Sequence, residues 1–243
     1  MFWVKKENQA KLNEALDTLA AMFGATFAGD MLVTFDRNMG FFEDARFMQA
    51  FNENVTNPVE KTLVWRLHVL CWNALNSLRV AGDFVECGVF QGFCSAVAAR
   101  YLDFSSVDKQ WYLYDTFTGI PPDQLNPGQQ NPPDFEREGL YEACRRRFAA
   151  YRNVHVLRGR VPDVLRERAP EKVAFMHIDM NSAAAEMGAL EFFWERMTPG
   201  AAIVLDDYGW RSYRAQKLAE DPFFAARGRQ VLELPTGQGL VLV

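Results

Sequence analysis

The sequence predicts an α/β protein with a doubly wound, mostly parallel sheet of seven strands and a helical extension at the N-terminus. Short apolar runs alternate with stretches of helical spacing along most of the chain, which is the pattern of βα units. The stretch 173–210 reads as strand, helix and strand, and such a unit places two parallel strands in a buried sheet. Near the C-terminus, two apolar runs flank Pro235-Thr236-Gly237-Gln238, which indicates a closing hairpin.

The predicted strands are short apolar runs, most of them followed by a glycine or a polar residue. They cover residues 83–87, 111–114, 154–157, 173–178, 201–205, 231–234 and 239–243. Helical spacing predicts helices at 60–80, 93–102, 140–150, 162–168, 186–196 and 211–226. The run Thr198-Pro199-Gly200 is expected to stop the chain before the fifth strand. Five βα units followed by an antiparallel pair are typical of a class I methyltransferase sheet rather than a six-stranded dehydrogenase sheet.

Two regions are predicted: a helical, phenylalanine-rich arm at 1–59 and the sheet domain at 60–243. Leucines at helical spacing predict a first helix over residues 5–23, ended by Gly24. Six phenylalanines follow in the arm: Phe27, Phe35, Phe41, Phe42, Phe47 and Phe51. We expect these rings to dock the arm onto the core. The alternative is that they line an acceptor pocket or a subunit interface.

Composition excludes several classes of protein. The chain has 243 residues, of which 49% are hydrophobic and 23% charged, so it can bury a large core. Its net charge of −5 argues against a nucleic-acid surface and leaves a small molecule as the expected partner. The four cysteines have no zinc-binding spacing, so reduced thiols in a cytoplasmic protein are expected. No apolar run is long enough to predict a membrane span, and the N-terminus is too charged for a secretory signal.

Carboxylates follow two of the predicted strands directly. Asp179 comes after one strand, and Asp206 and Asp207 come after the next. Ligands of open α/β sheets bind beyond the carboxyl ends of the strands, so these three side chains are expected to converge. Three carboxylates repel one another unless a cation lies among them, and oxygen ligands suit Mg²⁺. Each aspartate alone could equally be a turn or helix-capping residue.

A glycine-containing turn joins the first predicted strand to its helix. A dinucleotide fingerprint would need glycine where Phe90 stands, so a pyrophosphate ligand is disfavoured. Glu86, Gly88 and Gly92 instead suit a ligand with a cationic aminoacyl end and an adenosine, although Glu86 could merely cap the turn. Asp115, at the end of the second strand, is where a ribose is held in this architecture.

The connection 116–139 contains five of the eleven prolines and shows no helical or strand periodicity. Loops of this length inside a compact domain are usually functional or disordered. We favour a lid or a substrate-recognition loop over disorder. The turn at Gly159 is a further candidate for contact with an adenine ring.

In these motifs the chain resembles the macrocin O-methyltransferase family, whose members use S-adenosylmethionine and Mg²⁺ to methylate sugar hydroxyls. The resemblance runs from about residue 60 to residue 243 through GDFVECGVFQG, WYLYDTFTGIP, MHIDMN, TPGAAIVLDDYG and LPTGQGL. It implies that Glu86, Gly88 and Gly92 hold the methionine end of the cofactor and that Asp115 holds its ribose. It also implies a homo-oligomer, such as a dimer.

The same resemblance implies that Asp179, Asp206 and Asp207 bind the metal. One motif departs from the family, whose members more often show D-x-D-x-Y where this chain has Asp179-Met180-Asn181-Ser182-Ala183. An amide therefore replaces a carboxylate at Asn181, and an aromatic ring is missing. The departure bears on the acceptor class more than on the metal.

Methyl transfer from a sulfonium is an in-line displacement, so the enzyme must align a hydroxyl with the methyl group and make its oxygen nucleophilic. A metal that chelates two neighbouring hydroxyls would do both. Asp179 is the first candidate for the base and His177 the second, although a histidine within a buried strand is often only a satisfied core residue. The acceptor is then a sugar or another metabolite with neighbouring hydroxyls. Two alternatives remain: a nicotinamide-dependent oxidoreductase, and a non-catalytic S-adenosylmethionine-binding protein of the same fold.

Overall fold

The sheet that the sequence predicts is present in the computed structural model, which describes residues 4–23 and 26–243. Its seven strands lie in the order β5-β4-β3-β6-β7-β9-β8. Their bounds are β3 Asp83–Cys87, β4 Trp111–Asp115, β5 Val154–Arg158, β6 Val173–Ile178, β7 Met197–Leu205, β8 Leu232–Glu233 and β9 Gly239–Leu242. The first five are parallel to one another, and β9 runs antiparallel to both β7 and β8. The predicted class I methyltransferase architecture is confirmed.

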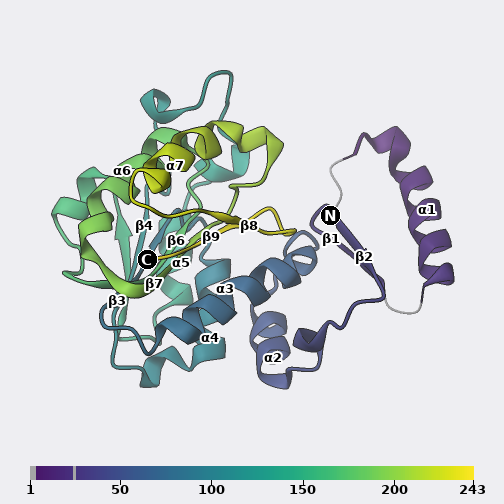
Figure 1. Ribbon diagram of the computed structural model, residues 1–243, viewed down its shortest axis with the longest axis horizontal. Helices are drawn as coiled ribbons and strands as arrows, with labels where there is room; N and C mark the ends of the chain where they lie inside the picture. Colours follow the sequence, from purple (N-terminus) through teal and green to yellow (C-terminus); the bar gives the residue numbers. More distant parts are fainter. Residues whose placement is uncertain (1–3, 24–25) are drawn as a thin grey trace.

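Helices cover both faces of this sheet (Figure 1). On one face lie α3 (Val64–Ser77) and α4 (Phe93–Leu102), and on the other α6 (Ala183–Phe193) and α7 (Arg214–Ala225). Side chains alternate between the faces along each strand. Phe84 therefore packs in the core cluster that contains α3 and α4 residues, and its neighbour Val85 packs in the cluster that contains α6 and α7 residues. The remaining α-helix of the sheet domain, α5 (Leu140–Arg147), follows the proline-rich connection.

The N-terminal arm contains helices, as predicted, and in addition a β-hairpin that the sequence analysis did not predict. Its helices are α1 (Gln9–Met22) and α2 (Ala45–Asn54), but an antiparallel hairpin of β1 (Thr26–Gly29) and β2 (Leu32–Phe35) lies between them. Asp30 and Met31 form the turn with positive φ angles of 49° and 59°. An aspartate tolerates this conformation, and β-branched and aromatic residues flank the turn, which favours strands. The predicted helix stop at Gly24 lies outside the described residues.

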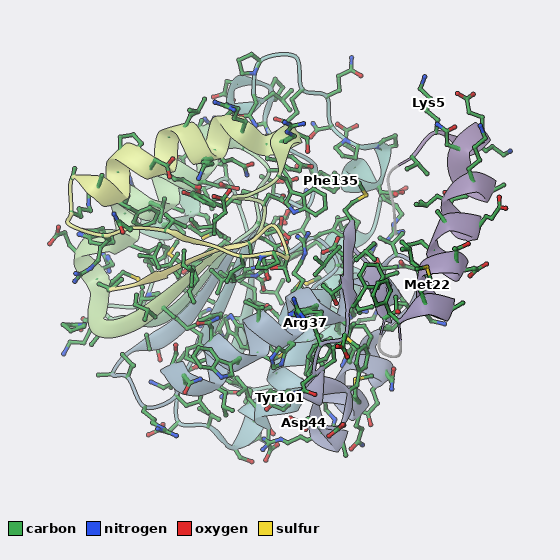
Figure 2. The ribbon with its side chains drawn as sticks, turned by 45° about the vertical axis from the view of Figure 1, so that its right-hand side comes forward. Lys5, Met22, Arg37, Asp44, Tyr101 and Phe135 are labelled. Atoms are coloured by element: carbon green, nitrogen blue, oxygen red, sulfur yellow. The ribbon has the colours of Figure 1, made fainter. Side chains whose placement is uncertain are left out.

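The later part of the arm shares the core of the sheet domain, whereas α1 does not. Phe41, Phe47 and Phe51 are buried in the cluster that contains α3 and α4. Figure 2 shows Asp44 beside Tyr101, whose hydroxyl donates a hydrogen bond to Asp44 over 3.2 Å. In contrast, α1 has no buried residue and stands apart from the sheet domain (Figure 1). Phe27 of the hairpin belongs to the same cluster, with its ring centroid 5.2 Å from that of Trp65 of α3, so the aromatic residues dock the arm onto the core from Phe27 onwards, as expected.

Three predicted boundaries shift for local reasons. The helix after β6 begins at Ala183 because the Ser182 hydroxyl accepts the N–H of Ala185 over 3.2 Å as an N-cap. Strand β7 begins before the predicted stop, since the N–H of Gly200 still pairs with the carbonyl of Val243 over 2.7 Å. The predicted helix at 162–168 is a single 3₁₀ turn, Asp163–Arg166. Among the described residues, no helix combines the length and apolarity needed to span a membrane.

Candidate active site

The predicted site residues do meet at one edge of the sheet. Backbone pairing continues for one residue past the ends of the central strands: Gly88 N–H donates to the Tyr114 carbonyl, and Asp179 N–H to the Cys87 carbonyl, each over 2.9 Å. Asp206 N–H likewise pairs with the Ile178 carbonyl over 2.9 Å. The carboxyl ends of β3, β6 and β7 therefore carry Gly88, Asp179 and Asp206 side by side. This is the ligand-binding edge of an open α/β sheet.

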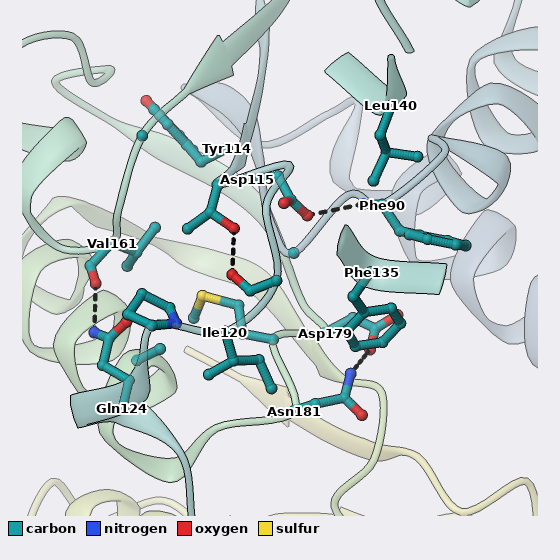
Figure 3. Close-up of a pocket in the computed structure, with 17 residues that line it drawn as sticks. Phe90, Tyr114, Asp115, Ile120, Gln124, Phe135, Leu140, Val161, Asp179 and Asn181 are labelled. Carbon is teal, nitrogen blue, oxygen red and sulfur yellow. Dashed lines mark hydrogen bonds between the residues drawn. The ribbon is translucent and has the colours of Figure 1, made fainter. Parts of the chain in front are cut away.

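A pocket of about 750 Å³, including the part open to solvent, lies above these strand ends (Figure 3). Gly88, Asp115 and Asp179 line it, together with Phe90 from the glycine turn and Gly159. The connection 116–139 forms much of the remaining wall through Ile120, Gln124 and Phe135. This loop is ordered, with 3₁₀ turns at Pro122–Gln124 and Pro133–Glu136. It therefore forms part of the pocket wall, and its role as a lid stays a prediction.

Asp115 holds the glycine turn in place. Its Oδ2 accepts the N–H of Phe90 over 2.8 Å (Figure 3). The same oxygen accepts the N–H of Val89 over 2.7 Å, and Oδ1 accepts the N–H of Phe117 over 2.6 Å. Phe90 takes a left-handed φ of 50° in this turn. A carboxylate oxygen has two acceptor positions, so Oδ1 keeps one for a ligand hydroxyl. Asp115 is thus both a structural clamp and a pocket residue.

The two predicted glycines are required for different reasons. Gly88 has a φ of +89°, and a Cβ there would lie 1.9 Å from the carbonyl oxygen of Asp179. Only glycine allows β3 and β6 to approach this closely at the pocket floor. Gly92 has a φ of +73°, and its Cβ would meet the ring of Phe148 at 2.6 Å. Gly92 does not line the pocket, so the structure gives it a packing role beside α4.

Glu86 and His177 face each other in the register of β3 and β6, away from the pocket lining. His177 is 1% exposed; its Nδ1 lies 2.9 Å from Oε1 of Glu86, and its Nε2 lies 3.4 Å from Oδ1 of Asp206. Burial alone lowers the pKa of His177, but the bonds to Asp206 and Glu86 outweigh it and raise the pKa to about 10. The structure therefore does not bring His177 to the reacting edge as a base. Oε2 of Glu86 is buried with no partner among the described residues.

Asp206 and Asp207 form ion pairs with an arginine side chain, Arg66. Arg66 of α3 contacts Oδ2 of Asp206 through Nη1, which also lies 3.5 Å from Oδ1 of Asp207. Gln238 donates to Oδ1 of Asp206 over 2.9 Å, so both oxygens of this carboxylate have partners. Burial tends to raise the pKa of Asp206, but Arg66 and His177 lower it overall. Burial and the charge of Asp206 raise the pKa of Asp207 to about 7, against the opposing effect of Arg66.

Of the three predicted metal ligands, Asp179 is the one that lines the pocket. Its Oδ1 accepts a hydrogen bond from Nδ2 of Asn181 over 3.2 Å (Figure 3). Burial, followed by the charges of Asp206 and Asp207, raises its pKa well above that of an ordinary aspartate. An aspartate at position 181 could not donate this bond and would add another negative charge. The amide of Asn181, which departs from the family motif, thus donates a hydrogen bond to Asp179 that a carboxylate at this position could not donate.

The arrangement does not fit a magnesium ion. A hard divalent cation needs free carboxylate oxygens, but those of Asp206 are taken up by Arg66, Gln238 and His177. Among the described residues, no three His, Cys, Asp or Glu side chains are grouped so as to hold a metal ion. The predicted site of Asp179, Asp206 and Asp207 is therefore not supported. The physical reason is that the guanidinium of Arg66 already lies against Asp206 and Asp207, where the metal ion was expected.

Sequence reasoning missed the residues that complete the site from distant parts of the chain. Asp30 of the β1–β2 turn accepts from Nε of Arg66 over 2.9 Å. Gln238 comes from the turn before β9. Asn126 and Gln129 of the proline-rich loop donate to the Asn181 carbonyl over 3.2 and 2.8 Å. Asp30, Asn126 and Gln129 stand in no recognisable motif, and Gln238 stands in LPTGQGL, which gives no sign of its contact with Asp206. The one available signal was Arg66, a cation on a helix whose other residues are mostly apolar.

Comparison with known proteins gives the same family from sequence and the same fold from structure. A family model described as macrocin O-methyltransferase matches residues 62–228. The mycinamicin III 3''-O-methyltransferase of Micromonospora griseorubida is 26% identical over 189 residues, which are 70% of this chain and 74% of that protein.

Solved structures of methyltransferases superpose over most of the chain. The O-methyltransferase NovP has a TM-score of 0.62 at 19% identity, with 97% of this chain and 98% of NovP covered. The calicheamicin methyltransferase CalS11 has a TM-score of 0.59 at 15% identity, with 86% and 94% covered. The methyltransferase PaMTH1 of Podospora anserina, bound to S-adenosylhomocysteine, has a TM-score of 0.52 at 9% identity, with 100% and 99% covered. Because the family model spans well over half of the sequence, the chain belongs to the macrocin O-methyltransferase family and is an O-methyltransferase.

Proposed function

We propose that this enzyme transfers the methyl group of S-adenosylmethionine to a hydroxyl of a sugar or another small molecule with neighbouring hydroxyls. The observation that carries the proposal is the position of Asp179, a buried carboxylate of raised pKa in the lining of the pocket beside the glycine turn. A carboxylate at a ligand-binding edge can accept the proton of a bound hydroxyl when it is ionised, and the raised pKa makes it a stronger base in that form.

The pocket residues fit the proposed cofactor. Asp115 has a free acceptor position for a ribose hydroxyl, and Phe90, Ile120 and Phe135 offer apolar surface for an adenine ring. Glu86 does not line the pocket, and its proposed contact with the ammonium group of the cofactor rests on its partnerless Oε2, two residues before Gly88. PaMTH1 is a methyltransferase solved with S-adenosylhomocysteine, which supports the same choice here. When bound, the cofactor would supply an electrophilic methyl group on a sulfonium.

The residues of this chain would then orient the acceptor and remove a proton. Asp179 is proposed to accept the proton of the hydroxyl as its oxygen bonds to the methyl carbon and the carbon–sulfur bond breaks. The Asn181 amide holds Asp179 in position through its hydrogen bond. Arg66 already pairs with Asp206 and Asp207 beside Asp179, so the proposed proton transfer does not use a metal ion.

The sugar acceptor is supported by named relatives. One is a 3''-O-methyltransferase of mycinamicin III, and CalS11 is described as a TDP-rhamnose 3'-O-methyltransferase. A second pocket next to the first is lined by amide and hydroxyl side chains and by Tyr213, and it shares Phe135 and Asn181 with the first. Neutral hydrogen-bonding groups beside an aromatic ring suit an uncharged polyhydroxylated acceptor.

Calorimetric titration with S-adenosylhomocysteine tests the cofactor half of the proposal. We expect binding to the wild-type protein and to the control D163N, whose carboxylate is exposed outside the pocket, and at least about tenfold weaker binding to D115N. An NADH titration addresses the oxidoreductase alternative, for which the ring of Phe90 leaves no approach to a pyrophosphate. Binding of NADH without binding of S-adenosylhomocysteine would refute the proposal.

We further propose that the enzyme is a cytoplasmic homodimer. Cys71, Cys87 and Cys144 are free and buried, as reduced thiols would be. Helix α1 carries partly exposed leucines and no buried residue, which leaves its apolar stripe available to a second copy. Light scattering coupled to gel filtration should give twice the 27.7 kDa chain mass, and a monomer at micromolar concentration would contradict this assembly.

A further inference from the structure

Arg66 is held in place from several directions at once. Its Nε donates to Asp30 over 2.9 Å, its Nη1 contacts Asp206 and lies 3.5 Å from Asp207, and its guanidinium carbon lies 5.5 Å from the ring of Trp210. Only 8% of the residue is exposed. A buried guanidinium is tolerated where carboxylates and a ring face complement its charge and shape. These partners come from the β1–β2 turn, the end of β7 and the turn after it. The surrounding fold therefore forms a binding site for the guanidinium of Arg66.

The three carboxylates around Arg66 carry more negative charge than one guanidinium neutralises. Asp206 gains a second cationic partner in His177, at 3.4 Å from Nε2. Burial lowers the pKa of Arg66, but the charges of Asp206, Asp30 and Asp207 outweigh it and raise the pKa further. Arg66 therefore remains charged at every relevant pH, and the acidic centre has a permanent cation.

We propose that Arg66 is the built-in counter-cation of this acidic centre, and that a divalent metal ion binds Asp206 and Asp207 only by displacing it. Arg66 and such an ion would compete for the same oxygen atoms. A divalent ion on these oxygens would lie next to the guanidinium, and like charges at such short range repel each other strongly even near a protein surface. Both cations cannot occupy the site in this arrangement.

Displacement of Arg66 by a metal ion would also affect the N-terminal arm, because Arg66 pairs with Asp30 of that arm. The turn of the β1–β2 hairpin contacts the acidic centre through the Asp30–Arg66 ion pair. A metal ion that displaced Arg66 would remove or redirect this pair. Divalent binding should therefore loosen the hairpin, and a docked hairpin should oppose divalent binding.

Binding of Mn²⁺, followed by electron paramagnetic resonance, tests the proposal directly. We expect the wild-type protein to bind Mn²⁺ only weakly, in the millimolar range, and R66Q to bind it about tenfold or more tightly, because the repelling charge is gone. D30N breaks the Asp30–Arg66 contact but keeps the cation beside Asp206, so its affinity should lie between those of the wild type and R66Q. R100Q, which removes an exposed arginine paired with Glu53, is the matched control and should behave as wild type.

The proposal is overturned if wild type binds Mn²⁺ at micromolar concentration, or if R66Q binds no more tightly than wild type while its circular dichroism spectrum is native. A second measurement needs no variant: saturating Mn²⁺ should speed amide hydrogen exchange at residues 26–35, and unchanged exchange upon binding would contradict displacement. Titration of the same samples with S-adenosylhomocysteine reports on the proposed function separately. If the protein did not bind S-adenosylhomocysteine, the proposed cofactor would be wrong, but the proposal that Arg66 competes with a metal ion would not be contradicted.

Discussion

The two carboxylates Asp115 and Asp206 stand at strand ends of the same sheet edge but are satisfied in different ways. Asp115 accepts three backbone N–H groups, all from nearby turns and all uncharged. Asp206 is held by the side chains of Arg66, His177 and Gln238, two of them cationic and all from other elements. The part of the sheet edge around Asp115, here called the cofactor side, is therefore fixed by hydrogen bonds to backbone groups. The part around Asp206, here called the acidic side, is fixed by charged and polar side chains from distant parts of the chain. The following predictions test this difference.

The largest effect is expected at Asp179, which lies between the two sides. D179N keeps the shape of the side chain but removes the proposed proton acceptor. The turnover number should fall by roughly 10²–10⁴-fold, the range for loss of a general base. Affinity for S-adenosylhomocysteine should stay within about twofold, because the cofactor side is held independently. Initial rates and calorimetry separate the two quantities, and near-normal turnover would remove Asp179 from its role.

Removal of His177 should cost the most stability. H177A leaves Glu86 and Asp206 facing each other across a buried gap, and breaking such a buried pair costs about 3–5 kcal/mol. The matched control H155A removes a half-buried imidazole with one hydrogen bond to Gln110, which should cost about 1 kcal/mol. Urea denaturation at neutral pH measures both free energies of unfolding. Equal losses in the two variants would contradict the charged bridge.

The pH dependence of stability gives an independent view of the same bridge. The pKa of His177 is raised from its ordinary value to about 10 in the folded protein. Its stabilising contribution is therefore complete below the unfolded pKa, near 6.5, and is lost as pH rises through about 10. The wild type should lose stability over this window relative to H177A. Parallel curves for the two proteins would show that His177 is not held as a cation.

An intermediate effect is expected on the cofactor side. D115N turns one acceptor oxygen into an NH₂ group that faces a backbone N–H, so at least one buried donor loses its partner at a cost of about 1–3 kcal/mol. The glycine turn should loosen, and affinity for S-adenosylhomocysteine should fall before turnover at saturating cofactor does. Steady-state kinetics with both substrates varied can resolve this order. Because no charged network is involved, the effect should be insensitive to salt.

The smallest effect is expected at Asn181. N181D replaces a hydrogen bond to Asp179 by a second carboxylate at about the same distance. Like charge favours the protonated form, so the already raised pKa of Asp179 should rise further. The acid limb of the pH–rate profile should then shift to higher pH by less than about one unit. A shift in the opposite direction would mean that Asn181 does not act through Asp179.

The sequence was sufficient for features that depend on local pattern. The seven strands follow from apolar runs, and Gly88, Asp115 and Asp179 follow from their positions at strand ends. The β1–β2 hairpin was missed because its turn, Asp30-Met31, lacks the glycine that usually marks one. Arg66 and Gln238 could not be placed, since their contacts with Asp206 cross 140 and 32 residues of chain. The metal prediction was not supported for this reason: the compensating charge comes from a helix far away in sequence.

The proline-rich loop carries one further consequence. Asn126 and Gln129 fasten it to the main-chain oxygen of Asn181, one residue beyond Met180 and two beyond the proposed base. Swinging the loop aside to admit a bulky acceptor must rupture these two bonds and release the backbone that positions Asp179. Entry of the acceptor and positioning of Asp179 are thereby coupled through the same two hydrogen bonds. Asp179 would reach its catalytic position only after the loop has closed over the bound acceptor.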